Sequence, residues 1–97
     1  MSRPASHFDY HGLHVPAPHA EAVRVDWVRA LRRADLLRVR EHTCMCTYPM
    51  FELCTAAGLW FVRKFTGEDP AKVQESTWMQ ARAARELWSQ ILAGQAC

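Results

Sequence analysis

The sequence predicts an α+β fold, in which a small antiparallel sheet of three to four strands lies between a short N-terminal helix and an amphipathic C-terminal helix. Three observations lead to this prediction. The chain has 97 residues, 49% of them hydrophobic, which suits one small domain with a core. Residues 37–41 alternate between apolar and charged side chains, the period of a strand with one solvated face. Residues 78–92 repeat apolar side chains at helical spacing.

The N-terminal part divides by composition into a tail and a helix. Residues 1–22 hold three prolines, few aliphatic side chains and no sustained period, so we expect a flexible tail before one compact domain over residues 23–97. From residue 23, apolar side chains recur at a spacing of four, four and three, which predicts a short helix: Val23, Trp27, Leu31 and Ala34.

The middle of the chain predicts the strands. Residues 37–41 form the first, and Tyr48-Pro49 suits a turn because proline fixes its own φ and disfavours helix in the residue before it. Residues 50–55 then return as the second strand. After a break at Ala57-Gly58, residues 59–66 form a third strand, whose apolar run on both faces is typical of a central position.

The last third of the chain predicts a turn, an edge strand and a helix. Residues 67–70 have the composition of a turn, and residues 72–75 would add a short edge strand. Ser76 or Thr77 would cap the last helix, and Gly94 would end it.

All four tryptophans fall on predicted apolar faces and are expected in the core: Trp27, Trp60, Trp78 and Trp88. Trp78 and Trp88 both lie on the apolar side of the predicted last helix. That side is broad for so small a sheet, so the helix is a candidate for homo-oligomer contacts.

Positive charge gathers in one segment of the chain. Residues 24–40 hold six arginines and two aspartates, whereas residues 41–97 hold five basic and six acidic side chains. We therefore take this segment as a candidate partner-binding surface, with a solvated face as the alternative: Arg29, Arg32, Arg33, Arg38 and Arg40. A protein partner is favoured over nucleic acid, because the sequence pI of 8.5 lies below the range of dedicated DNA-binding domains.

Several function classes lack their sequence signals. No apolar run approaches the roughly 18 residues that a membrane-spanning helix needs, and the N-terminus has no apolar stretch typical of a secretion signal. We therefore expect a cytoplasmic protein without a membrane partner. The sequence also has no Gly-rich phosphate loop, no paired-carboxylate constellation and no Ser/His/Asp arrangement, so we lean against an enzyme.

The most informative segment is a cluster of soft metal ligands at residues 42–54. It contains His42, Cys44, Cys46 and Cys54, three of the chain's four cysteines and one histidine. Thiolates and imidazole are the ligands that zinc prefers, so these four residues are the candidate metal site and zinc is the candidate cofactor. A single residue separates Cys44 from Cys46, fewer than the two to four residues usual in zinc sites.

Geometry limits which of these residues can share an ion. In a strand, alternate residues point to the same face, so Cys44 and Cys46 can both reach one metal. His42 and Cys46 are roughly 13 Å apart along a straight strand, so a four-ligand site requires a turn at residues 42–46. Cys54 would return on the facing strand, opposite His42 or nearer Cys44.

Two further interpretations of the cysteines stay open. They can be buried and inert, acting as small hydrophobic side chains. Alternatively, Arg38 and Arg40 can lower the thiol pKa of Cys44 and Cys46, as a nucleophile or redox sensor requires.

The tail offers a second, weaker metal hypothesis. It holds four of the five histidines, and a helix would place His7, His11 and His14 on one face. Gly12 and Pro16 disfavour such a helix.

The sequence thus supports two functional hypotheses. The first is a small non-catalytic binding or adaptor module, stapled by zinc, that presents its arginine-rich segment to a protein. The second is a thiol-dependent enzyme or redox sensor built on Cys44, Cys46 and Cys54.

Overall fold

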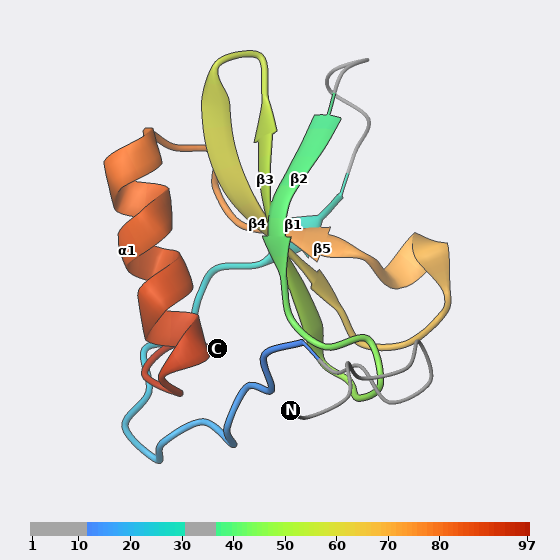
Figure 1. Ribbon diagram of the computed structural model, residues 1–97, viewed down its shortest axis with the longest axis vertical. Coiled ribbons are helices and arrows are strands. Elements are labelled where there is room, and N and C mark those ends of the chain that lie inside the picture. The colour runs from blue at the N-terminus through green and yellow to red at the C-terminus, as the bar shows by residue number, and fades with distance from the viewer. Residues whose placement is uncertain (1–11, 31–36) are drawn as a thin grey trace, which may run out of the picture.

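A computed structural model describes residues 12–30 and 37–97 and has an α+β architecture. Its five-stranded antiparallel sheet has the order β1-β5-β4-β3-β2, and a single C-terminal helix, α1, stands against one face (Figure 1). The strands are β1 (Val28–Arg29), β2 (Leu37–His42), β3 (Met50–Ala56), β4 (Leu59–Phe65) and β5 (Gln74–Glu75). A 3-10 turn, η1 (Pro70–Lys72), precedes β5, and α1 spans Ala81–Leu92.

The β3–β4 hairpin forms the centre of the sheet. Both strands have seven residues and pair from Met50↔Phe65 to Ala56↔Leu59, so that only Ala57 and Gly58 form the turn. Both turn residues have positive φ, 51° and 78°, as a two-residue turn needs if it is to follow the right-handed twist of its strands. The predicted second and third strands are confirmed within one residue at each end.

The strand count and the position of β5 differ from the prediction. The sheet has five strands, not three or four, and β5 lies between β1 and β4 rather than at an edge. Ser76 and Met79 continue the pairing with β4 through backbone hydrogen bonds to Val62 and Trp60, of 2.8 Å and 2.7 Å. Residues 72–75 alone did not indicate this inner position, because it depends on pairing with Val28 and Arg29, which lie far away in the sequence.

The predicted N-terminal helix is wrong over the residues that the structure describes. Residues 23–30 are extended, and β1 pairs with β5. Val25 and Trp27 face inward, so the residues alternate with a period of two rather than four. The backbone N–H groups of Val23 and Val25 donate to carbonyls of the C-terminal segment, each at 2.9 Å. Valine has few χ1 rotamers and favours extended backbone. The hydrogen bonds to the C-terminal carbonyls stabilise the extended conformation over a helix. Leu31 and Ala34 lie outside the described residues.

Segment 12–22, which we expected to be part of a flexible tail, makes backbone contacts with the sheet and with the C-terminus. Leu13 forms a parallel bridge with Thr43, and the N–H of His19 donates to the carbonyl of Gly94 at 2.9 Å. Residues 1–11 lie outside the described part.

Helix α1 begins later than predicted. Its N-cap is Gln80, which makes no side-chain capping bond, whereas Ser76 and Thr77 lie in the extended segment that follows β5. The hydroxyl of Ser76 instead accepts the N–H of Val62 at 3.0 Å. Gly94 follows the helix with φ of 74°, which confirms its predicted role at the C-terminal end.

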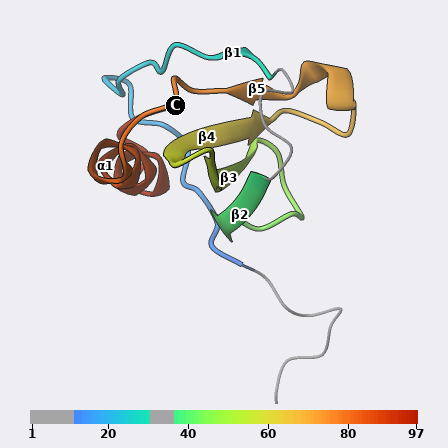
Figure 2. The same cartoon turned by 90° about the horizontal axis from the view of Figure 1, so that it is seen from above.

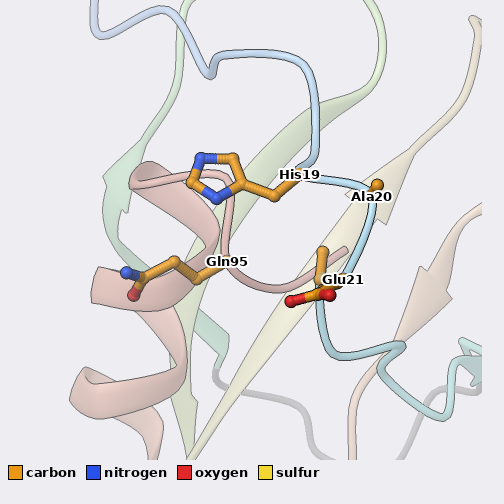
Figure 3. A pocket seen from close by; sticks show the side chains of 5 residues that line it. His19, Ala20, Glu21 and Gln95 are labelled. Carbon is orange, nitrogen blue, oxygen red and sulfur yellow. The ribbon is translucent and has the colours of Figure 1, made fainter.

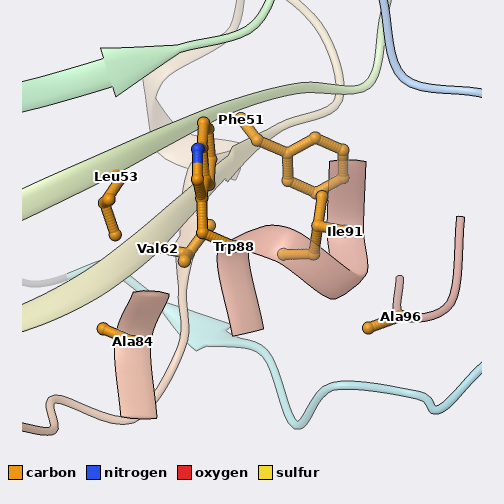
Figure 4. Packing of buried hydrophobic residues seen from close by; sticks show 7 residues of the cluster. All are labelled: Phe51, Leu53, Val62, Ala84, Trp88, Ile91 and Ala96. Carbon is orange, nitrogen blue, oxygen red and sulfur yellow. The ribbon is translucent and has the colours of Figure 1, made fainter. Parts of the chain in front are cut away.

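The main core lies between α1 and the sheet. Trp88 and Ile91 of the helix pack with Phe51, Leu53 and Val62 of the central hairpin (Figure 4). Trp88 is 4% exposed, and its indole N–H donates to Glu41 at 3.2 Å. The view from above shows α1 to one side of the strands (Figure 2). No helix among the described residues is long and apolar enough to cross a membrane.

The other tryptophans are partly buried. Trp27 and Trp60 pack against the main core, and Trp78 stacks on Phe61 at 4.5 Å on the opposite face of the sheet. Because Trp78 precedes α1 and Trp88 faces the sheet, the helix does not present two tryptophans to a second copy. Self-association through this helix stays a prediction.

Candidate metal centre

Two distant segments meet where the N-terminal segment runs beside the β2–β3 connection (Figure 1). The parallel bridge between Leu13 and Thr43 sets the register, and the N–H of Cys44 donates to the carbonyl of Leu13 at 2.7 Å. This register places His14, the next residue, beside Cys44. A hydrogen-bonded backbone contact therefore fixes the position of the imidazole relative to the cysteine cluster.

The side chains of His14, Cys44 and Cys46 converge at this point. Their ligand atoms all lie within 4.8 Å of one another, close enough to hold a metal ion. The Sγ atoms of Cys44 and Cys46 are 3.0 Å apart, and Nε2 of His14 lies 3.7 Å from Sγ of Cys46. Two sulfurs bound tetrahedrally to one zinc ion lie just under ~4 Å apart, so ligation requires shifts of less than about 1 Å.

The local backbone explains how two cysteines separated by one residue reach the same point. β2 ends at His42, and residues 45–46 form a turn. Thr43 holds the turn, because its hydroxyl accepts the N–H of Phe51 at 3.0 Å and its N–H donates to the Phe51 carbonyl at 2.9 Å. Cys44 is buried and Cys46 is exposed, so the site opens to solvent on one side.

The contact between the two thiols also affects the protonation of Cys46. The hydrogen bond with the Cys44 thiol raises the pKa of Cys46 above the ordinary cysteine value, and desolvation and the charge of a Cys44 thiolate add to the effect. Without a metal, this contact favours the protonated form of the Cys46 thiol near neutral pH. A bound cation reverses this balance, since it stabilises the two thiolates together.

The structure does not bring His42 or Cys54 to this group. His42 pairs with Glu52 across the sheet, and its Nδ1 lies 2.9 Å from the carbonyl oxygen of Thr43. Cys54 pairs with Val39 and not with His42, because the register of β2 and β3 places Glu52 opposite His42.

Cys54 occupies an interior position on the face opposite α1. It is fully buried with Ala56 and Phe61, and burial raises the pKa of its thiol to about 12, with the Glu52 carboxylate adding to the effect. A thiol with this pKa is inert near neutral pH.

His14 is the ligand that sequence spacing did not assign to the cysteines. It entered only through the tail hypothesis with His7 and His11, which both lie outside the described residues. No local pattern joins His14 to Cys46, because the two are 32 residues apart.

The arginines predicted to bind a partner are divided between the two edges of the described sheet. Arg38 and Arg40 lie on β2 at one edge, and Arg29 lies on β1 at the other. Arg29 lines a cavity of about 340 Å³ with residues of the η1–β5 region. Arg32 and Arg33 lie outside the described residues.

A further cavity, of about 480 Å³, lies at the C-terminal end of α1, where His19, Glu21 and Gln95 line it (Figure 3). Its lining holds one imidazole and one carboxylate but no cysteine or serine that could act as a nucleophile.

Comparisons with protein-family models, with curated proteins and with solved structures found no match.

Proposed function

We propose that this chain is a small non-catalytic binding module stapled by a zinc ion held by His14, Cys44 and Cys46. The convergence of these three ligands from two distant segments carries the proposal. Two sulfur ligands and one imidazole form a donor set that suits zinc. In a tetrahedral site, the fourth position is left for water or for a ligand outside the described residues.

The position of the site favours a structural role for the metal. The backbone of residues 12–14 contacts the β2–β3 connection through the parallel bridge between Leu13 and Thr43, which includes the short hydrogen bond from Cys44 to Leu13. A metal that closes the 32-residue loop from His14 to Cys46 would stabilise the fold by roughly 3–4 kcal/mol on a chain-entropy argument. A domain with so small a core gains much from such a cross-link.

The residues around the site also favour a structural zinc ion over a catalytic one. A hydrolytic zinc needs a nearby group that accepts a proton from the bound water. Within the described part of the chain, no carboxylate joins the three ligands.

The test is native mass spectrometry of protein purified without a His-tag or a chelator, which reports metal content and oligomeric state together. We expect one zinc ion per chain, and we expect a chelator to lower the melting temperature by several degrees. A chain that remains metal-free after incubation with excess zinc would refute the proposal.

The thiol-dependent hypothesis has one observation in its favour. Cys46 is exposed, and its Sγ lies 3.0 Å from that of Cys44, which suits reversible oxidation of the pair. The raised pKa of Cys46 argues against a reactive thiolate. Alkylation separates the two functions: a zinc-bound Cys46 is protected until a chelator is added, whereas a reactive Cys46 is alkylated rapidly in metal-free folded protein.

A further inference from the structure

A small cationic cavity lies at the edge of the sheet, where β2 begins beside the turn of the β3–β4 hairpin. It has a volume of about 240 Å³, and Arg38, Arg40, Thr55, Gly58 and Trp60 contribute to its lining. This volume is below the range of about 300–1,000 Å³ that is typical of small-molecule sites. The cavity is the size of a side chain rather than of a cofactor.

The guanidinium group of Arg40 is held in place by its neighbours. Its Nε donates to the hydroxyl of Thr55 at 3.1 Å, and its Cζ lies 5.7 Å from the centroid of the Trp60 ring. Arg38 and Arg40 are alternate residues of β2 and so point to the same face of the sheet, and Arg40 lies at the β-bulge between Val39 and Glu41. The Nε contact leaves the terminal N–H groups to bind a ligand, and an arginine fixed in this way loses little entropy on binding.

The charge around the cavity is positive. Arg85 of α1 also lies over Trp60, at 4.7 Å, but it is paired with Glu41 at 3.6 Å. Among the described residues, neither Arg38 nor Arg40 has a carboxylate within ion-pair distance. Paired guanidinium groups of this kind match the two oxygens of a carboxylate, with which arginine forms two parallel hydrogen bonds.

The adjoining strand adds a second feature to the surface. In the described sheet β2 is the last strand, and all six of its residues are exposed. Leu37 and Val39 point away from the arginine side and remain 38% and 43% exposed. A peptide that pairs with the first half of β2 would therefore place alternate side chains beside arginines and beside aliphatic groups.

From these observations we infer that β2 and its cavity bind an extended protein segment in which acidic and apolar residues alternate, with one carboxylate held by Arg38 and Arg40. This inference deepens the proposed binding function by naming the class of partner, and it does not depend on the metal. Nucleic acid fits this surface less well, because two guanidinium groups already lie over the ring of Trp60, where a base would stack.

Fluorescence anisotropy with a labelled six-residue peptide of alternating glutamate and valine, capped at both ends, tests the inference. The comparison probes are the same peptide with glutamine in place of glutamate, a block peptide of three glutamates followed by three valines, and a ten-nucleotide oligo-dT. We expect the alternating peptide to bind most tightly, and its addition to shift the amide resonances of residues 37–40 and 55–60.

The protein variants locate the site. Arg40→Gln and Arg38→Gln should each weaken binding of the alternating peptide about tenfold, whereas Arg82→Gln, the same change of charge on the exposed side of α1, should leave it within twofold. Arg40→Lys keeps the charge but loses the two parallel hydrogen bonds of a guanidinium group. It should weaken peptide binding less than Arg40→Gln does. Circular dichroism and amide spectra confirm that each variant is folded.

Several outcomes would overturn the inference. These are equal affinity for the glutamine or block peptide, equal losses in Arg82→Gln and Arg40→Gln, tighter binding of the oligonucleotide, or no binding of the alternating peptide at millimolar concentration. Each measurement is made on chains of known zinc content. Failure of the zinc staple and failure of the peptide site are therefore seen separately.

Discussion

Nε2 of His14 lies 3.7 Å from Sγ of Cys46, although the two residues are 32 positions apart in the sequence. Cys46 is exposed at the turn after β2, and His14 reaches it because Leu13 is bridged to Thr43. The contact connects an N-terminal segment without regular secondary structure to the edge of the sheet. The same contact makes the metal proposal testable by single substitutions.

The first prediction concerns the identity of the ligands. His14→Ala should lower the zinc affinity at least about hundredfold, because it removes one of three ligands. His19→Ala, a matched change in the same exposed segment, and His42→Ala should both leave the affinity unchanged. Competition with a chromogenic chelator measures all three variants. Zinc loss in His42→Ala but not in His14→Ala would place the site where the sequence spacing alone had put it.

The second prediction concerns the pH dependence of stability. The pKa of Cys54 is raised from 9.0 to about 12 by burial, so between these pH values the folded chain binds more protons than the unfolded chain. The stabilisation is present below pH 9 and is lost as the pH rises towards 12. For this group the free energy of unfolding should fall by about 1.4 kcal/mol per pH unit above pH 9.

Urea denaturation from pH 8 to 10.5 checks this slope, with Cys54→Ala as the reference. The variant is expected to be less stable at pH 8 and to show a shallower decline. Parallel curves for the two proteins would show that Cys54 does not titrate in this way.

The third prediction concerns the end of α1. Gly94 has φ of 74°, and a Cβ atom there would lie 3.1 Å from the carbonyl oxygen of Ala17. Gly94→Ala should therefore lower the free energy of unfolding by about 2 kcal/mol or more, from backbone strain together with this contact. Gly58→Ala has a similar φ but open space around the new methyl group, so only the strain of about 1–2 kcal/mol applies. Chemical denaturation should rank the two variants in this order, and equal losses would remove the role of the Ala17 contact.

The fourth prediction concerns the packing of the helix. Trp88→Ala should cost about 3–5 kcal/mol, because it opens a cavity between α1 and the central hairpin. Trp88→Phe retains most of the apolar contact but loses the hydrogen bond to Glu41, and it should cost about 1–2 kcal/mol. Ser89→Ala, at an exposed position of the same helix, is the control.

Denaturation curves measure the stability of the Trp88 variants, and sedimentation measures their oligomeric state. A fully stable, folded Trp88→Ala chain would contradict this packing. A change from dimer to folded monomer would instead support self-association through the helix.

The elements with a strong local pattern were predictable from the sequence. Alternation indicated β2, the break at Ala57-Gly58 fixed the β3–β4 hairpin, and helical spacing with Gly94 indicated α1. The sequence also pointed to Cys44 and Cys46 as candidate ligands, and these two side chains lie close enough to hold a metal with His14. These features depend on side-chain period and on turn chemistry, which neighbouring residues set among themselves.

Other features depend on segments that meet only in the folded chain. Residues 23–30 carry spacing that also fits a helix, but hydrogen-bond acceptors on the C-terminal segment and on β5 hold them extended. His14 joins Cys44 and Cys46, and Cys54 does not, because strand register and a backbone bridge decide which side chains face one another. The hairpin and the last helix were thus predictable from the residues of each segment alone, since local periodicity and turn chemistry encode them. The strand order and the approach of His14 to the cysteines depend on pairing between distant segments, which leaves no local pattern in the sequence.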